Sequence, residues 1–243
     1  MYKNIAFEKA MSFAKSVSYP KAGEKPHGAA VRPAITISRL TGAGGHVIAA
    51  ELAEFLQDRV PGDQPWTVFD QNLVEKVLED HNLEKRVADA MSEEHKSMFA
   101  DLVEAIIRKH PSAWTLVEHT SATILRLATM GNVILVGRGG VVITSKLPNA
   151  FHVRLVGSLE KRIEYGQRVY GVDREAALNF IKKRDEGRKR YLKDYFDVDV
   201  DDPLLYHVTI NTDLMGYEEA TRMIGDEVIR RFNLDKALKV ASS

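Results

Sequence analysis

Residues 34–52 read AITISRLTGAGGHVIAAEL, and this stretch decides the fold. Its first five residues are β-branched or small, which is typical of a short buried strand. The glycine-rich segment 42–45 follows, and apolar residues then recur at the spacing of one helix face, at Ile48, Leu52 and Phe55. A strand that leads through a glycine-rich turn into a helix predicts an anion site, because the first N–H groups of a helix are unpaired and its dipole is positive there.

The rest of the sequence repeats this alternation of strands and helices. Apolar stripes at helical spacing occur between Leu116 and Ala128 and between Ala220 and Val228. Strands that alternate with helices predict an α/β fold, a parallel sheet covered by helices on both faces. Right-handed crossovers then place the loops that follow the strands at one edge, where ligands bind. Besides 34–38, the segments with strand character are 66–70, 133–136, 150–156 and 207–211.

Composition narrows the class of protein. The chain has 243 residues, 44% of them apolar, which is enough for one large domain with a substantial core. Lysine plus arginine equals aspartate plus glutamate, so the formal net charge is zero, and this balance argues against a dedicated nucleic-acid binder. Cysteine is absent, which excludes disulfides, thiolate metal sites and thiol catalysis. No segment has the length and apolarity of a membrane span or a secretory signal, so we expect a cytoplasmic protein without a membrane partner.

Two other patterns look like metal sites only superficially. Asp197, Asp199, Asp201 and Asp202 are closely spaced, but the glycine and terminal glutamate of an EF-hand loop are missing. A solvated acidic loop is the favoured interpretation. The histidines show no H-E-x-x-H spacing, so structural or surface roles are their default.

Four ordered motifs carry a resemblance. They are ITISRLTGAGGHVIAAELAEFL (35–56), GNVILVGRGG (131–140), RVYGVDREAALNFIKKRDEGRKRYLKDYF (168–196) and INTD (210–213). Together they resemble the cytidylate kinase-like family, over residues 33 to 232. The resemblance implies the three-layer fold of P-loop nucleoside-monophosphate kinases, with a five-stranded parallel sheet. It also implies transfer of the γ-phosphoryl group of ATP, with Mg²⁺, to a nucleoside monophosphate such as CMP or dCMP.

The resemblance also divides the chain. A P-loop kinase-like domain is expected over 33–235, after an N-terminal helix and linker extension at 1–32 and before a tail at 236–243. Within the domain, 72–112 corresponds to the helical insertion that binds the monophosphate, and 160–200 to a mobile lid. The extension fits either packing onto the domain or a homodimer contact.

Site residues follow from the matched motifs, one position at a time. The turn that binds nucleotide phosphate consists of Thr41, Gly42, Ala43, Gly44, Gly45 and His46. The acceptor nucleotide is assigned to Asp70, Arg138 and Asp185, of which Arg138 matches the arginine of the family's GRD motif. The base of the lid carries Arg162 and Arg168. The catalytic cations are Arg39, Arg184 and Arg188.

Three positions depart from true cytidylate kinases. Gly45 stands where the lysine of the phosphate loop is expected, and Val136 and Gly139 replace two aspartates. Arg39 could substitute for the lysine, because a guanidinium offers two donors to a phosphate, although its reach differs from that of an ammonium. For magnesium, which prefers oxygen ligands, Thr41 and Asp70 are the nearest candidates.

These departures keep other interpretations open. One is a pseudo-kinase that binds nucleotide and acts as a sensor or partner-binding module. Another is nucleic-acid binding through the basic cluster 182–190, which the neutral overall charge disfavours. Each motif also has an ordinary structural explanation: Asp70 as a helix cap, Arg138 as a surface residue, and 182–190 as a solvated helix face.

Overall fold

The computed structural model describes residues 31–62, 64–70, 114–137 and 139–235. Strands and helices alternate along the chain, as the sequence predicts. In order they are β1 (Ala34–Arg39), α2 (Gly45–Arg59), β2 (Thr67–Phe69), α6 (Trp114–Met130), β3 (Val133–Val136), α7 (Gly140–Ile143), β4 (Ala150–Val156), α8 (Leu159–Tyr170), α9 (Arg174–Phe196), the 3₁₀ turn η1 (Pro203–Leu205), β5 (Val208–Asn211) and α10 (Tyr217–Arg231). The predicted insertion 72–112, most of the extension 1–32, the tail and Arg138 lie outside the described residues.

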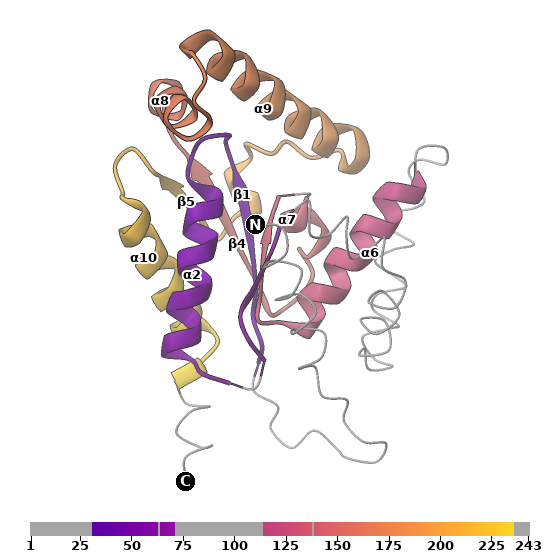
Figure 1. The fold of residues 1–243 in the computed structure, drawn as a ribbon. Coiled ribbons are helices and arrows are strands. Elements are labelled where there is room, and N and C mark those ends of the chain that lie inside the picture. Colours follow the sequence, from indigo (N-terminus) through magenta and orange to yellow (C-terminus); the bar gives the residue numbers. More distant parts are fainter. Residues whose placement is uncertain (1–30, 63, 71–113, 138, 236–243) are drawn as a thin grey trace, which may run out of the picture.

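The strands form one parallel sheet in the order β2-β3-β1-β4-β5. Central β1 pairs with β3 and β4, so that Ile37 lies opposite Val136 on one side and Val153 on the other. Helices α2 and α10 cover one face of the sheet and α6 and α7 the other, while α8 and α9 lie across its upper edge (Figure 1). The predicted α/β fold with a five-stranded parallel sheet is therefore confirmed.

Strand boundaries differ from the predicted ones by a residue or two. Strand β1 continues to Arg39, whereas β2 is shorter than the predicted segment 66–70. The physical reason at β2 is that the Trp66 N–H donates to the side-chain oxygen of Gln57, at 2.9 Å, and not to a neighbouring strand.

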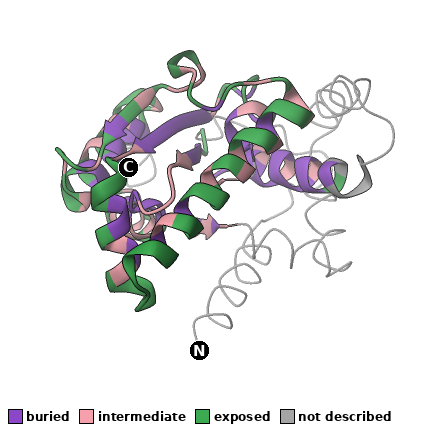
Figure 2. Ribbon diagram, turned by 90° about the horizontal axis from the view of Figure 1, so that it is seen from above, coloured by how far each residue is buried: buried purple, intermediate pink, exposed green. Residues whose placement is uncertain are grey.

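The main core lies between the sheet and helices α2 and α10. In Figure 2 buried segments lie in the interior and exposed ones on the outer sides of the helices. Alternate residues of each strand point into this core, as the pleat requires. Burying each such side chain contributes about 1.5–3 kcal/mol, so this face specifies the register strongly. Its members include Ile35, Ile37, Ile48, Leu52, Leu56, Phe151, Val153, Leu155, Ile224 and Val228.

The residues between these apolar ones make the opposite face of β1 and β4 polar. Thr36 lies beside His152, and Ser38 lies beside Arg154. The Thr36 hydroxyl and His152 Nδ1 are 2.9 Å apart, and burial lowers the pKa of His152 to about 4. The imidazole is therefore neutral at pH 7, and one hydrogen bond joins it to the hydroxyl. Thr36, His152 and Arg154 are thus buried although their side chains are polar.

Helices α8 and α9 form a hairpin with well-defined ends. The Ser158 side chain caps α8, and the Asp173 carboxylate caps α9 by accepting from the Ala176 N–H at 2.8 Å. A small apolar cluster of Ile163, Ala177 and Ile181 holds the two helices together. This cluster buries little surface, so polar contacts with the sheet edge decide where the hairpin sits.

Candidate functional site

The glycine turn joins β1 to α2 at the carboxyl edge of the sheet. Gly42 and Gly44 adopt φ of 87° and 76°, in the left-handed region that favours glycine. Gly44 is the N-cap of α2, and no side chain caps that helix end. The first N–H groups of α2 and its positive dipole end therefore face the turn, which is the geometry of an anion site. Of the six residues predicted to bind phosphate, Thr41 to Gly44 lie in this turn, and Gly45 and His46 begin α2.

Arg39, the last residue of β1, folds back over the turn. A Cβ at Gly45 would lie 2.9 Å from Arg39 Cγ, so the arginine stem occupies the space where a side chain at 45 would begin. The guanidinium reaches the backbone at Gly137, just after β3, where an added Cβ would collide with Nη1. Burial, and then the nearby charge of Arg188, lower the pKa of Arg39 to about 10. The side chain is still a cation at neutral pH.

Helix α9 is fastened to the turn by Asp185. Its Oδ1 accepts hydrogen bonds from the Thr41 N–H at 2.8 Å and from the Thr41 hydroxyl at 2.7 Å. Its Oδ2 accepts from Arg162 Nη1 at 2.6 Å. Burial alone would raise the pKa of Asp185, but the hydrogen bonds from Thr41 and the charge of Arg188 outweigh it and lower that pKa. The carboxylate is ionised, and it contacts the turn rather than the cavity.

Two arginines complete this contact. Arg188 Nη2 donates to Asp185 Oδ1 at 2.8 Å and also to the Thr41 hydroxyl. Arg162, on α8, donates through Nε to the Gly157 carbonyl at 3.0 Å and through Nη1 to the Thr41 carbonyl at 3.2 Å. All polar groups of Thr41 are thus bonded to α8 or α9. The hairpin of α8 and α9 is thus fastened to the glycine turn through Thr41.

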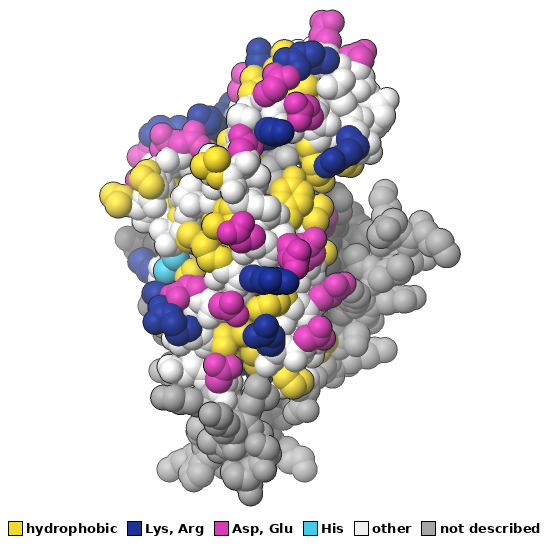
Figure 3. Space-filling view, turned by 90° about the vertical axis from the view of Figure 1, so that its left-hand side faces the viewer, with side chains coloured by type: hydrophobic (Ala, Val, Ile, Leu, Met, Phe, Trp, Pro, Cys, Tyr) yellow, Lys and Arg dark blue, Asp and Glu magenta, His cyan; other side chains and the backbone are white. Residues whose placement is uncertain are grey.

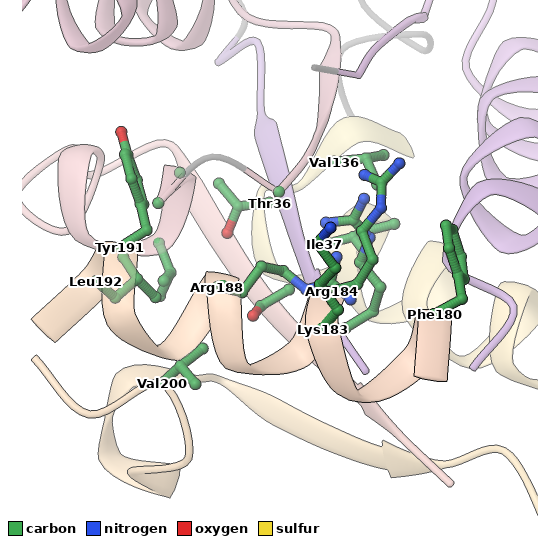
Figure 4. Close-up of a pocket in the computed structure, with 17 residues that line it drawn as sticks. Thr36, Ile37, Val136, Phe180, Lys183, Arg184, Arg188, Tyr191, Leu192 and Val200 are labelled. Atoms are coloured by element: carbon green, nitrogen blue, oxygen red, sulfur yellow. The ribbon is translucent and has the colours of Figure 1, made fainter. Parts of the chain in front are cut away.

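A cavity of about 540 Å³ opens between α9 and the sheet edge. Arg184 and Arg188 extend from α9 toward β1, with Phe180 at one end of their row and Tyr191 toward the other (Figure 4). Arg39 and Lys183 also line the cavity, and none of the described residues that line it carries a carboxylate. The structure therefore brings the three predicted catalytic arginines around one cavity with a strong preference for anions.

The glycines after β3 let α9 approach the sheet closely. A Cβ at Gly139 would lie 3.2 Å from a methyl of Leu192, 3.3 Å from the ring of Phe196 and 3.7 Å from that of Tyr191. An aspartate at this position would have to displace those side chains. Glycine in place of the aspartate of GRD therefore leaves room for α9 to pack on this turn.

A second cavity, of about 470 Å³, lies on the other side of the glycine turn. Gly42, Tyr165, Arg168 and Tyr217 are among its lining residues. The Tyr217 ring packs on Gly44, where a Cβ would collide with it, and meets Tyr165 edge-on with centroids 6.5 Å apart. Arg168 lies over the Tyr165 ring, 5.8 Å from its centroid. Aromatic faces and a cation beside the turn form a surface suited to a planar base.

Asp70 follows β2 at the same edge. Its Oδ2 is 3.7 Å from Nε2 of His46, in the first turn of α2. Burial, and then the charge of Arg39, lower the pKa of His46, so the imidazole is neutral at pH 7. The carboxylate also lies close enough to Arg39 to favour its charged form. The Asp70 carboxylate thus interacts with Arg39, one of the arginines that line the larger cavity.

The described residues do not build a cage for magnesium. No group of three or more His, Asp or Glu side chains is arranged for a metal in the part of the chain that the structure describes. The Thr41 hydroxyl, a predicted candidate ligand, lies between the Asp185 carboxylate and the Arg188 guanidinium. A divalent cation there would face the positive charges of Arg162 and Arg188, so Thr41 does not fit that role. Asp70 has the right ligand chemistry.

The four clustered aspartates have structural partners. Asp197 pairs with Lys193, Asp201 with Arg154, and Asp202 accepts from the Leu204 N–H. Asp199 accepts from the N–H of Asp201. These contacts give the four aspartates a structural role, which is to hold the segment between α9 and β5 in its conformation.

Sequence reasoning missed the tyrosines of the second cavity. Tyr165 and Tyr217 stand in helices, where an aromatic residue is typical of a core position. The sequence does hold one indication for Tyr217: it begins the helix after β5, at the carboxyl edge of the sheet, where ligands bind.

The surface matches the balanced composition. On the face that carries α10, basic and acidic side chains are intermixed, with no broad area of one sign (Figure 3). None of the described helices combines the length and apolarity that crossing a bilayer needs.

Comparisons with known proteins agree with this geometry. The crystal structure of an uncharacterized protein from Eubacterium ventriosum ATCC 27560 superposes with a TM-score of 0.54, at 24% identity, over 81% of this chain and 98% of that chain. At that identity the likeness shows the fold alone. No curated protein matches the sequence. The model of the cytidylate kinase-like family matches residues 34–214, most of the chain, and this protein is therefore a member of the cytidylate kinase-like family, which indicates a nucleotide kinase.

Proposed function

We propose that the protein transfers the γ-phosphoryl group of ATP to a nucleoside monophosphate, CMP or dCMP being the acceptors that the family suggests. One observation carries the proposal. The Arg39 side chain lies over Gly45, where the family's lysine would start, and reaches from the glycine turn into the cavity that Arg184 and Arg188 share. A cation is thus present where the missing lysine would have supplied one.

The two cavities suit the two substrates. The smaller one would take the donor base against the faces of Tyr165 or Tyr217, so that the phosphates extend along the turn from Gly42. The larger one would take the acceptor, with its phosphate facing the arginines. The glycine turn separates them, so both phosphate ends meet beside Arg39. In-line transfer requires that arrangement.

The chain's own residues would act mainly on charge and position. Backbone N–H groups of the turn bind the donor phosphates, and Arg39, Arg184 and Arg188 neutralise the charge on the transferred group. Mg²⁺ bound to the ATP phosphates would add further positive charge when present. Helices α8 and α9 act as the lid that excludes water. We assign Asp185 to holding this lid on the turn through Thr41. Arg138 stays a predicted acceptor contact.

The test is direct. Purified protein is incubated with MgATP and a panel of nucleoside monophosphates, and ADP and the diphosphate product are measured by chromatography. We expect stoichiometric formation of both with at least one pyrimidine acceptor. An absence of acceptor-dependent ADP across the panel would reject the proposal.

A second function is favoured by a different observation. The described residues provide no set of carboxylates for magnesium, and α9 is already fastened to the turn through Asp185. Both fit a nucleotide-binding module that does not turn over. Calorimetry distinguishes the two functions: binding of ATP with no product formation in the panel would select this one.

A further inference from the structure

A buried arginine lies on the polar face of the sheet, outside both cavities. Arg154, on β4, is 4% exposed. Its Nη1 donates to the Ser38 hydroxyl at 2.9 Å, and its Nη2 donates to Asp201 Oδ1 at 2.6 Å. The two arms of one guanidinium thus join strand β1 to the loop that follows α9.

The loop is in turn bonded to α9 through Asp201. Asp201 Oδ2 is 2.5 Å from Lys189 Nζ. The Tyr206 hydroxyl donates to the Val200 carbonyl at 2.7 Å and lies 3.3 Å from the Ser38 hydroxyl, which holds the loop against the same strand. Burial alone would raise the pKa of Asp201, but the hydrogen bond from Lys189 and the charge of Arg154 lower it. Asp201 is ionised at neutral pH and pairs with both cations.

The two ends of this connection are adjacent to the arginines of the site. Ser38 immediately precedes Arg39, and Lys189 immediately follows Arg188. Removing a guanidinium from water costs several kcal/mol unless it is well paired, and an apolar side chain would fill a sheet face more cheaply. Stability alone is therefore a weak reason for an arginine here. Its two specific partners point to a role in geometry.

We propose that Arg154 and Asp201 are a positioning pair that fixes the distance between Arg39 and Arg188. This inference rests on the proposed function, because that distance is the gap which a transferring phosphoryl group must fit. Neither residue lines either of the two cavities described above. Loss of the pair would therefore disturb the alignment of the phosphoryl group more than the binding of the donor base.

The first experiment compares kcat with KM. Arg154→Met and Asp201→Asn should each lower kcat about 10- to 100-fold, the cost of misplacing a reacting group by about 1 Å, with KM for ATP nearly unchanged. Lys189→Met cuts only the arm to α9 and keeps Arg154 paired, so it should show a smaller loss of the same kind without a folding defect. The control is Arg174→Met, on the same helix as Lys189, which breaks an exposed ion pair with Glu160 of α8 and should leave kcat unchanged.

A double-mutant cycle tests whether Arg154 acts through Arg188. If it does, Arg154→Met should have little further effect once Arg188 is replaced by methionine. Fully multiplicative losses, or a Lys189→Met variant indistinguishable from Arg174→Met, would overturn the proposal.

One measurement keeps this inference separate from the proposed function. Amide exchange in α9 around Arg188 tests the pair without turnover: Arg154→Met should accelerate this exchange and Arg174→Met should not. If wild-type protein makes no product, the proposed function fails; faster exchange around Arg188 in Arg154→Met would still support the pair, and unchanged exchange would reject it.

Discussion

The stem of Arg39 lies over Gly45 so closely that a Cβ at that position would be 2.9 Å from Arg39 Cγ and 3.3 Å from its Cβ. The two residues are therefore coupled: the arginine is accommodated because position 45 has no side chain. Gly45 is also the first residue of α2, and its φ is not in the left-handed region. The glycine is needed for space and not for its backbone conformation.

This coupling predicts that Gly45→Ala changes the free energy of unfolding in opposite directions with and without Arg39. In the wild-type background, Gly45→Ala should destabilise the protein by about 1–3 kcal/mol, because overpacking forces the Arg39 stem to move. In an Arg39→Ala background the same substitution should stabilise it by up to about 1 kcal/mol, because alanine is the better helix former. Urea unfolding of the four proteins measures both values.

Equal effects of Gly45→Ala in the two backgrounds would show that Arg39 does not occupy the space over the turn. Gly187→Ala serves as a control, since nothing lies within 4 Å of a Cβ added there. Because Gly187 lies inside α9, this substitution should stabilise the protein by up to about 1 kcal/mol, and equally with and without Arg39.

The contact between Asp185 and Thr41 predicts that α9 is released when the carboxylate is neutralised. Asp185→Asn should lower the free energy of unfolding by about 1–3 kcal/mol, the range for hydrogen bonds to charged groups. Amide exchange in α9 should accelerate at the same time, because that helix has few apolar contacts with the sheet. The matched control is Asp197→Asn, which breaks an ion pair with both side chains over 60% exposed and should cost under about 1 kcal/mol. Unchanged exchange in α9 would contradict the role given to Asp185.

The buried His152 predicts loss of stability in mild acid. Its pKa is lowered from 6.5 to about 4 by burial, so between these values the unfolded chain binds more protons than the folded one. Stability should therefore fall as pH falls from about 6.5 to about 4, by about 3 kcal/mol at about 1.4 kcal/mol per pKa unit. His152→Asn, whose amide can still form a hydrogen bond with Thr36, should flatten this part of the curve. An identical pH dependence in wild type and variant would show that His152 titrates normally.

The second cavity predicts a base-specific defect. Tyr217→Ala should weaken ATP binding about tenfold, through loss of about 1–3 kcal/mol of stacking, whereas binding of inorganic tripolyphosphate should hardly change. Tyr217→Phe keeps the ring and should bind ATP like wild type. Calorimetry with both ligands makes the comparison. Equal losses for ATP and tripolyphosphate would mean that Tyr217 supports the turn and contacts no base.

The fold was readable because the deciding signals are local. The strand at 34–38, the glycine turn and the helix stripe at Ile48 and Leu52 are adjacent in sequence, and each alone favours its observed structure. Even the wrong boundaries at β2 have a tertiary cause, the bond from Trp66 to Gln57, which no local pattern contains.

The site was less readable, because its contacts join distant parts of the chain. Thr41 and Asp185 are 144 positions apart, and nothing in the lid motif indicates that its aspartate faces the turn. The direction of the Arg39 side chain depends on the neighbouring end of β3, at Gly137. Charge and position could suggest Arg39 as a substitute for lysine, but only packing places it over Gly45.

The central claim is that Arg39 supplies the positive charge at the phosphoryl group. The most direct measurement is single-turnover transfer from radiolabelled ATP, with wild-type protein and Arg39→Met, at saturating acceptor. The account predicts a rate lower by about 10³-fold, the lower range for loss of an arginine that contacts the transferred group, with the affinity for ATP changed by less than about tenfold. Transfer by Arg39→Met at the wild-type rate would contradict it.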